Sequence, residues 1–99
     1  MRVLMKVSVP VESGNKAMKD GSMGKIIGDT VERIRPEAAY FGLEGGKRTA
    51  FFVFDLKNVT DMPSIGEPIL AGLHANLEVT PVMTAQDLKA GLEAWQRQS

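Results

Sequence analysis

The first half of the chain contains one alternating segment and one segment with a helical period. Arg2–Pro10 alternates between apolar and other side chains, which is typical of a half-buried strand that ends at the proline. Ser13–Lys16 suggests the start of a helix with one or two turns before Gly21. From Met23 to Ile34, apolar residues recur at helical spacing and predict an amphipathic helix.

The second half of the chain repeats this combination. A short helix is expected from about Ser64 to Leu73, followed by an alternating strand, Asn76–Met83, in which Pro81 indicates a sheet edge. Thr84 and Asp87 resemble a capping box, with aspartate in place of the usual glutamate. The helix that begins there has apolar residues at i, i+4 and i+7: Leu88, Leu92 and Trp95.

Between these halves, Ala38–Leu56 reads as two strands joined by a turn at Gly45-Gly46. A two-residue turn places Glu44 opposite Lys47, and directly paired residues share a face. A three-residue loop with a bulge would change these relations. The first face is almost entirely apolar and should lie under the helices: Ala39, Phe41, Leu43, Arg48, Ala50, Phe52, Phe54 and Leu56. The second face mixes aromatic and ionisable residues: Ala38, Tyr40, Gly42, Thr49, Phe51, Val53 and Asp55.

The second face raises the question of what covers it. Strands 2–10 and 76–83 add further residues to it: Leu4, Lys6, Ser8, Glu78, Thr80 and Val82. Its apolar residues would form a sizeable exposed patch on a monomer. Both crossover helices are expected on the opposite side, because such connections are right-handed. We therefore predict a homodimer through the sheet face, with a cavity between the two sheets.

Composition excludes several classes of protein. A chain of 99 residues is one domain, 1–99, by size. It has no cysteine and one histidine, which argues against disulfides, a transition-metal site or haem, so we expect no metal and no cofactor. The net charge is zero and no apolar run is long enough to span a membrane, so nucleic-acid and membrane partners are not expected. No signal peptide is apparent, and we expect a cytoplasmic protein.

Five segments carry a resemblance that covers nearly the whole chain: KVSVPVESGNKA, PEAAYF, GKRTAFFVFDL, EPIL and LEVTPVM. They are similar to segments of a family of short uncharacterised bacterial proteins. The order β-α-β-β-α-β plus a C-terminal helix resembles the ferredoxin-like fold, and the dimeric α+β barrel group within it. This resemblance implies an α+β fold with a four-stranded antiparallel sheet, and a dimer. The barrel group includes monooxygenases, isomerases, haem enzymes and ligand-sensing domains, so it implies no single activity.

Six residues of the second face are candidates for lining a pocket: Lys6, Tyr40, Phe51, Asp55, Glu78 and Thr80. We expect Lys6 to reach Glu78 or Asp55, because the first strand lies between the third and the fourth in a ferredoxin-like sheet. One hypothesis is that the protein binds a small molecule between the sheets. The alternatives are a cofactor-independent enzyme of monooxygenase or isomerase type, which would need a shifted pKa in this set, and a protein-interaction or structural domain. Mutual neutralisation of these charges would need no ligand at all.

Other features have simpler interpretations. His74 follows the predicted helix 64–73, where an imidazolium would complement the helix dipole. Ser13–Lys16 would present free amides to an anion if it formed a loop, although helix capping explains it as well. Trp95 and the methionines, including Met5, Met23 and Met83, are expected to fill the core.

Overall fold

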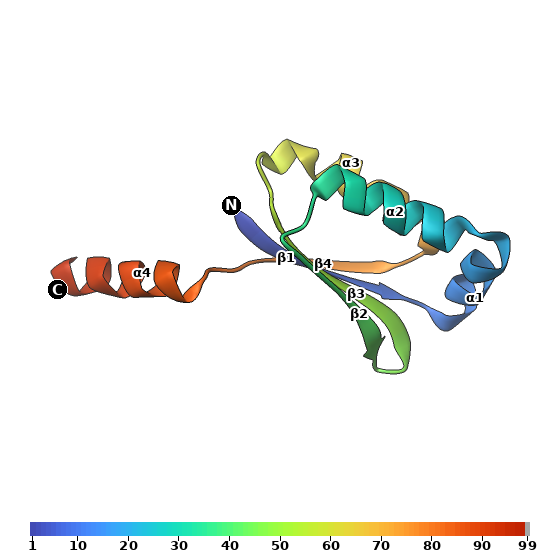
Figure 1. Ribbon diagram of the computed structural model, residues 1–99, viewed down its shortest axis with the longest axis horizontal. Coiled ribbons are helices and arrows are strands. Elements are labelled where there is room, and N and C mark those ends of the chain that lie inside the picture. The colour runs from blue at the N-terminus through green and yellow to red at the C-terminus, as the bar shows by residue number, and fades with distance from the viewer. Residues whose placement is uncertain (99) are drawn as a thin grey trace.

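A computed structural model describes residues 1–98 as an α+β fold (Figure 1). The strands are β1 (Arg2–Val9), β2 (Ala38–Glu44), β3 (Lys47–Asp55) and β4 (Asn76–Pro81). The helices are α1 (Val11–Asp20), α2 (Ser22–Ile34), α3 (Met62–Leu73) and α4 (Ala85–Gln98), with a 3-10 turn, η1, at Val59–Asp61. The strands form one antiparallel sheet in the order β2-β3-β1-β4. This confirms the predicted ferredoxin-like order with an added C-terminal helix.

The hairpin has the predicted register. Glu44 pairs with Lys47 and Tyr40 with Phe51, so the connection contains two residues and no bulge. Both connecting glycines have positive φ, 60° at Gly45 and 76° at Gly46. These angles fit the type I′ turn, whose twist matches that of the flanking strands.

The crossover from β1 to β2 differs from the prediction. A complete ten-residue helix, α1, begins directly after Pro10, and the amide of Gly14 donates to the Pro10 carbonyl oxygen at 2.8 Å. The Ser13 hydroxyl donates to the Leu73 carbonyl oxygen at 2.8 Å, which ties α1 to the end of α3. The segment Ser13–Lys16 therefore lies inside a helix, and the anion-binding loop considered for it does not form. Gly21, with φ of 82°, separates α1 from α2.

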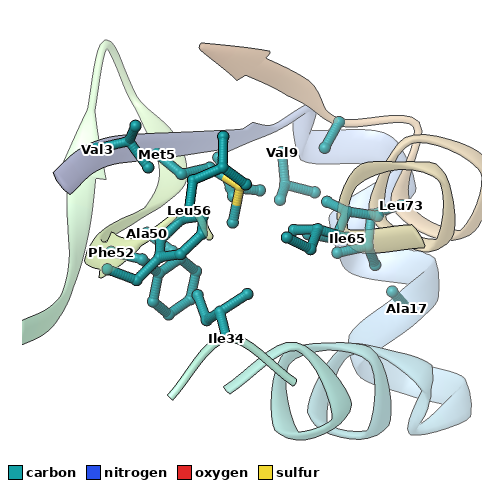
Figure 2. Packing of buried hydrophobic residues seen from close by; sticks show 14 residues of the cluster. Val3, Met5, Val9, Ala17, Ile34, Ala50, Phe52, Leu56, Ile65 and Leu73 are labelled. Carbon is teal, nitrogen blue, oxygen red and sulfur yellow. The ribbon is translucent and has the colours of Figure 1, made fainter. Parts of the chain in front are cut away.

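The hydrophobic core lies between the sheet and the helices on one of its sides. Figure 2 shows Met5 and Phe52 from the sheet meeting Ile34, at the end of α2, and Leu56, which follows β3. The side chains of Met5, Phe52, Phe54, Ile69 and Leu73 are almost completely inaccessible to solvent. Both α2 and α3 cover the same side of the sheet (Figure 1), as the right-handed connections predict. The other side is covered by none of the described helices.

Coverage by the helices stops short of β2, which corrects part of the predicted core. Phe41 and Leu43 lie on the helix side but are 62% and 77% exposed. The Phe41 ring meets Phe52 edge to face, with ring centroids 5.7 Å apart. The prediction of a shared face was therefore right, and the prediction that Phe41 and Leu43 are buried was wrong. Within residues 1–98, the contacts of β2 are mainly with β3, because α2 and α3 lie over the other strands.

Helix α4 stands apart from the rest of the molecule (Figure 1), which is 56 Å long in its largest dimension. Its apolar stripe, defined by Leu88, Leu92 and Trp95, is exposed, and Trp95 is 62% accessible. Met83, in the connection from β4, is exposed as well. Trp95 and Met83 therefore do not fill the core of this chain, contrary to the prediction, whereas Met5 does.

A capping box begins α4, as predicted. The Asp87 amide donates to Thr84 Oγ1 at 3.1 Å, and the Thr84 amide donates to Asp87 Oδ2 at 3.1 Å. Replacing Thr84 by alanine should weaken α4 locally by about 1 kcal/mol, because an orphan helix amide loses its acceptor. Amide hydrogen exchange in α4 should then become about fivefold faster by the same principle. Thr80→Ala, an exposed change on β4, is the matched control, and equal exchange rates in the two variants would contradict the capping role.

The same capping box gives α4 a dependence on pH. The backbone amide of Thr84, and then its side chain, lower the pKa of Asp87 below its usual value. A carboxylate with a lowered pKa stabilises the folded helix above its usual pKa of about 4. That contribution is lost as the pH falls through the lowered pKa, so the protection of the α4 amides, taken relative to their intrinsic exchange rate at each pH, should decrease in acid.

Candidate functional site

The candidate site is the open sheet face, which is the side of the sheet away from α2 and α3. Cross-strand pairing places four predicted site residues in one row across all four strands: Tyr40, Phe51, Lys6 and Glu78. Thr80 lies in the adjacent row, with Ala38, Val53 and Leu4. The structure thus brings together five of the six predicted residues, with the aromatic pair at the β2 side and the charged pair at the β4 side.

Lys6 is the electrostatic centre of this face. Its Nζ lies 2.6 Å from Glu44 Oε1 and 3.4 Å from Glu78 Oε2, and the ion pair with Glu44 spans β3. The hydrogen bond to Glu44 is the main reason that the pKa of Lys6 is raised above its usual value. Glu78 was a predicted partner of Lys6, whereas Glu44 was not in the predicted set. Glu44 lies four residues after Tyr40 on β2, and residues an even number apart on a strand share a face. This spacing is the feature of the sequence that could have identified Glu44.

Asp55 lies outside this cluster, so of the two partners considered for Lys6 only Glu78 is in contact with it. Asp55 pairs with Arg2 in the register, two rows from Lys6 and thus about 13 Å along the strand. The amino group of Met1 donates to Asp55 Oδ1 at 2.7 Å, and this bond lowers the pKa of the Asp55 carboxyl. Asp55 instead borders a cleft of about 420 Å³ near the start of α3, whose rim also carries Arg33, Arg35 and Lys57.

Lys6 supplies hydrogen-bond donation rather than proton abstraction on the open face. A lysine whose pKa is raised stays an ammonium at neutral pH, whereas a general base must be able to lose its proton near the working pH. An ammonium has three donors, and Glu44 and Glu78 do not use all of them. Lys6 is therefore suited to hold an acceptor group of a ligand between the aromatic and acidic ends of its row.

A second concavity lies on the helix side of the sheet and was not predicted. This α2–β2 groove measures about 530 Å³ and is mostly apolar. Its lining comprises Val7, Val9, Met18, Met23, Gly24, Ile27, Gly28, Phe41, Gly42, Arg48, Thr49 and Ala50. Gly24 and Gly28 are the feature of the sequence that could have predicted the groove. They lie four residues apart, so they fall on the same side of α2 and leave that side without side chains there.

His74 occupies the C-cap of α3 with φ of 52°, so its predicted position at the end of that helix is confirmed. Among residues 1–98, no group of three or more His, Asp or Glu side chains has the arrangement of a metal site. None of the helices in this range is long and apolar enough to cross a membrane.

Comparison with known proteins adds no relative from which a residue's role could be transferred. No protein-family model matches the sequence, and no curated protein matches it. The fold is therefore established by the structure, while the resemblance to a family of short bacterial proteins stays a prediction.

Proposed function

We propose that the protein binds a planar small molecule at the open sheet face, and that a second copy of the chain covers this face. The observation that carries the proposal is the row formed by Tyr40, Phe51, Lys6 and Glu78, over which none of the helices described within residues 1–98 lies. Tyr40 is 70% exposed and Phe51 is half-buried in this row, and apolar side chains left open beside polar ones are typical of a binding surface.

The row favours a particular class of ligand. Tyr40 and Phe51 offer adjacent aromatic rings, on which a planar apolar molecule can stack. Lys6 pairs with Phe51 in the sheet, and its ammonium can donate to a carbonyl or hydroxyl oxygen of the same molecule. The two carboxylates of Glu44 and Glu78 together outweigh the single positive charge of Lys6, so a neutral ligand fits better than an anion.

A second copy would close the site. Two packed sheets lie about 10 Å apart, which leaves space for a flat molecule where side chains are small. Ala38, Gly42 and Thr80 are such positions on the open face. Because the net charge of the chain is zero, no long-range electrostatic repulsion opposes self-association. The acid–base enzyme hypothesis gains no support from Lys6, because the pKa of this lysine is raised rather than lowered.

Coumarin, a neutral planar lactone with a carbonyl acceptor, is a suitable probe. Titration followed by amide chemical shifts should give saturable changes on β1 and β3 around Lys6 and Phe51. Lys6→Met should weaken coumarin binding about tenfold, because a hydrogen bond from a charged donor is lost. Lys47→Met is the matched control, since Lys47 is an exposed lysine at the start of the neighbouring strand β3 and forms no ion pair within residues 1–98. It should change the affinity less than twofold by the same reasoning.

Two outcomes would contradict the proposal. Saturable shifts confined to the α2–β2 groove would place small-molecule binding on the wrong side of the sheet. An absence of saturable shifts, together with a dimer whose open faces are packed without space, would favour the protein-interaction hypothesis instead.

A further inference from the structure

Two apolar features of the molecule have no role in the proposed function. One is the exposed stripe of α4, and the other is the α2–β2 groove on the helix side of the sheet. The apolar face of an amphipathic helix stabilises a protein only when it is buried. Binding of such a helix in an apolar groove is a common mode of recognition. We therefore asked whether the stripe and the groove fit each other.

Within one chain the stripe and the groove are too far apart. The connection 82–84 leaves the sheet beside Arg2, because the Val82 amide donates to the Arg2 carbonyl oxygen at 3.1 Å. The groove contacts Val7 and Val9, at the other end of β1, and opens at β2, on the other edge of the sheet. These positions are about 20 Å apart along the strands and about 14 Å apart across them. After this connection α4 extends away from the sheet (Figure 1), so the stripe does not lie at the groove of its own chain.

We propose that α4 of one copy docks in the α2–β2 groove of a second copy, and that the contact is reciprocal. The floor of the groove suits a helix, because Gly24 and Gly28 leave space along α2: a β-carbon at either glycine would meet no other atom within 4 Å. Trp95 and the two leucines of the stripe supply the side chains that fill such a space. Met18 and Phe41, exposed at the groove, would be covered by the same contact.

The area is of the size that a dimer needs. From typical side-chain areas, the exposed parts of the stripe and of the groove come to roughly 550 Å² per contact. Two reciprocal contacts would hide roughly 1,100 Å², close to the lower limit of about 1,200 Å² for stable interfaces. The remainder can come from the open sheet faces or from Leu43, which lies on the same side of β2 as the groove.

The contact is compatible with a dimer through the open sheet faces. A two-fold axis parallel to the strands, between two facing sheets, sets β4 of one copy over β2 of the other. The connection 82–84 then begins beside the partner's β2 edge, about 20 Å along the strands from the partner's groove. The connection, which spans up to about 11 Å, and a helix of 14 residues, about 21 Å long, together cover this distance. The contact goes beyond the proposed function, since it requires no ligand.

Trp95 is the only tryptophan and reports on the contact directly. Light scattering at increasing concentration should show a dimer, with Trp95 emission shifting to the blue as the dimer forms. Leu92→Lys should raise the dimer dissociation constant at least about tenfold and return the emission to that of an exposed indole, because a charge would enter an apolar groove. Ala90→Lys places the same charge on the opposite side of α4 and should leave both readouts unchanged. Both positions are exposed in the single chain, so neither variant should fail to fold.

A cross-linking experiment shows which surfaces meet. The chain has no cysteine, so single cysteine variants give no background. Under mild oxidation, Leu92→Cys mixed with Gly24→Cys or Gly28→Cys should give a disulfide-linked dimer with at least one partner, whereas Ala90→Cys should give none with either.

Three results would overturn the inference. The first is a monomer at all concentrations, and the second is a Trp95 that is buried in a monomer. The third is a dimer in which Trp95 stays exposed or neither cysteine pair forms. The third result would leave a sheet-face dimer and its ligand site possible, so it separates failure of the α4 contact from failure of the proposed function. Coumarin binding without a blue shift of Trp95 emission would likewise show that the α4 contact fails while the proposed function holds.

Discussion

Replacing Phe52 by alanine is expected to lower the free energy of unfolding by about 3–5 kcal/mol, the largest effect of any single substitution considered for this protein. Phe52 is fully buried at the centre of β3, where β1 lies on one side and β2 on the other. Its ring faces the helices in the middle of the core, so its removal leaves a cavity that rigid neighbouring strands do not fill. Domains of this size have a stability of only about 5–15 kcal/mol, so the variant should be close to unfolding.

Phe41→Ala is the matched control, because it makes the same change on the same face one strand away. Phe41 is largely exposed and loses mainly its edge-to-face contact with Phe52, so the expected loss is about 1 kcal/mol. Urea unfolding followed by circular dichroism measures both variants, at a concentration low enough to keep the chain monomeric. Equal losses in the two variants would show that β2 is covered in the monomer, contrary to the structure.

The hairpin was predictable because two local signals agree. A Gly-Gly pair between alternating segments fixes a two-residue turn, and the turn fixes every pair of facing residues. The period of two then divides the residues between the faces, so that Phe52 and Tyr40 were assigned to the correct sides. The same rule placed most of the candidate site correctly, since Lys6, Phe51 and Tyr40 lie in one row.

The predictions of burial were wrong where burial depends on how far a neighbouring helix extends. Alternation assigns a face but does not show how far a helix extends over it, so Phe41 was expected in the core although α2 and α3 do not reach β2. A similar limit applies to α4, since its helical period predicts an apolar stripe without showing where the stripe packs. Asp55 was misplaced for a third reason: sharing a face says nothing of the distance along a strand.

These misplaced apolar residues follow a pattern. Phe41 and the stripe of α4 are among the residues that a single chain leaves uncovered, and both were expected in a core on the basis of their hydrophobicity. The tendency of such residues to be buried still applies when the burial occurs between copies. The sequence contains apolar residues suited to burial, and the single chain buries only some of them.

The turn that fixes the register should also be sensitive to substitution. Replacing Gly46 by valine is expected to lower the free energy of unfolding by about 2 kcal/mol, because φ of 76° is unfavourable for a side chain that branches at its β-carbon. No atom lies within 4 Å of a β-carbon at this position, so the cost comes from the backbone rather than from a clash. Urea unfolding of the monomer measures the loss.

Gly45→Asn is the control that isolates backbone conformation from loss of a glycine. Asparagine adopts positive φ more readily than other residues and is favoured at the first position of a type I′ turn. Gly45, with φ of 60°, occupies that position, so the change should cost less than about 0.5 kcal/mol. Losses of similar size in Gly45→Asn and Gly46→Val would contradict a type I′ turn. Without that turn, the pairing that brings Tyr40, Phe51 and Lys6 into one row would have no local determinant, and the candidate site would depend on the core alone.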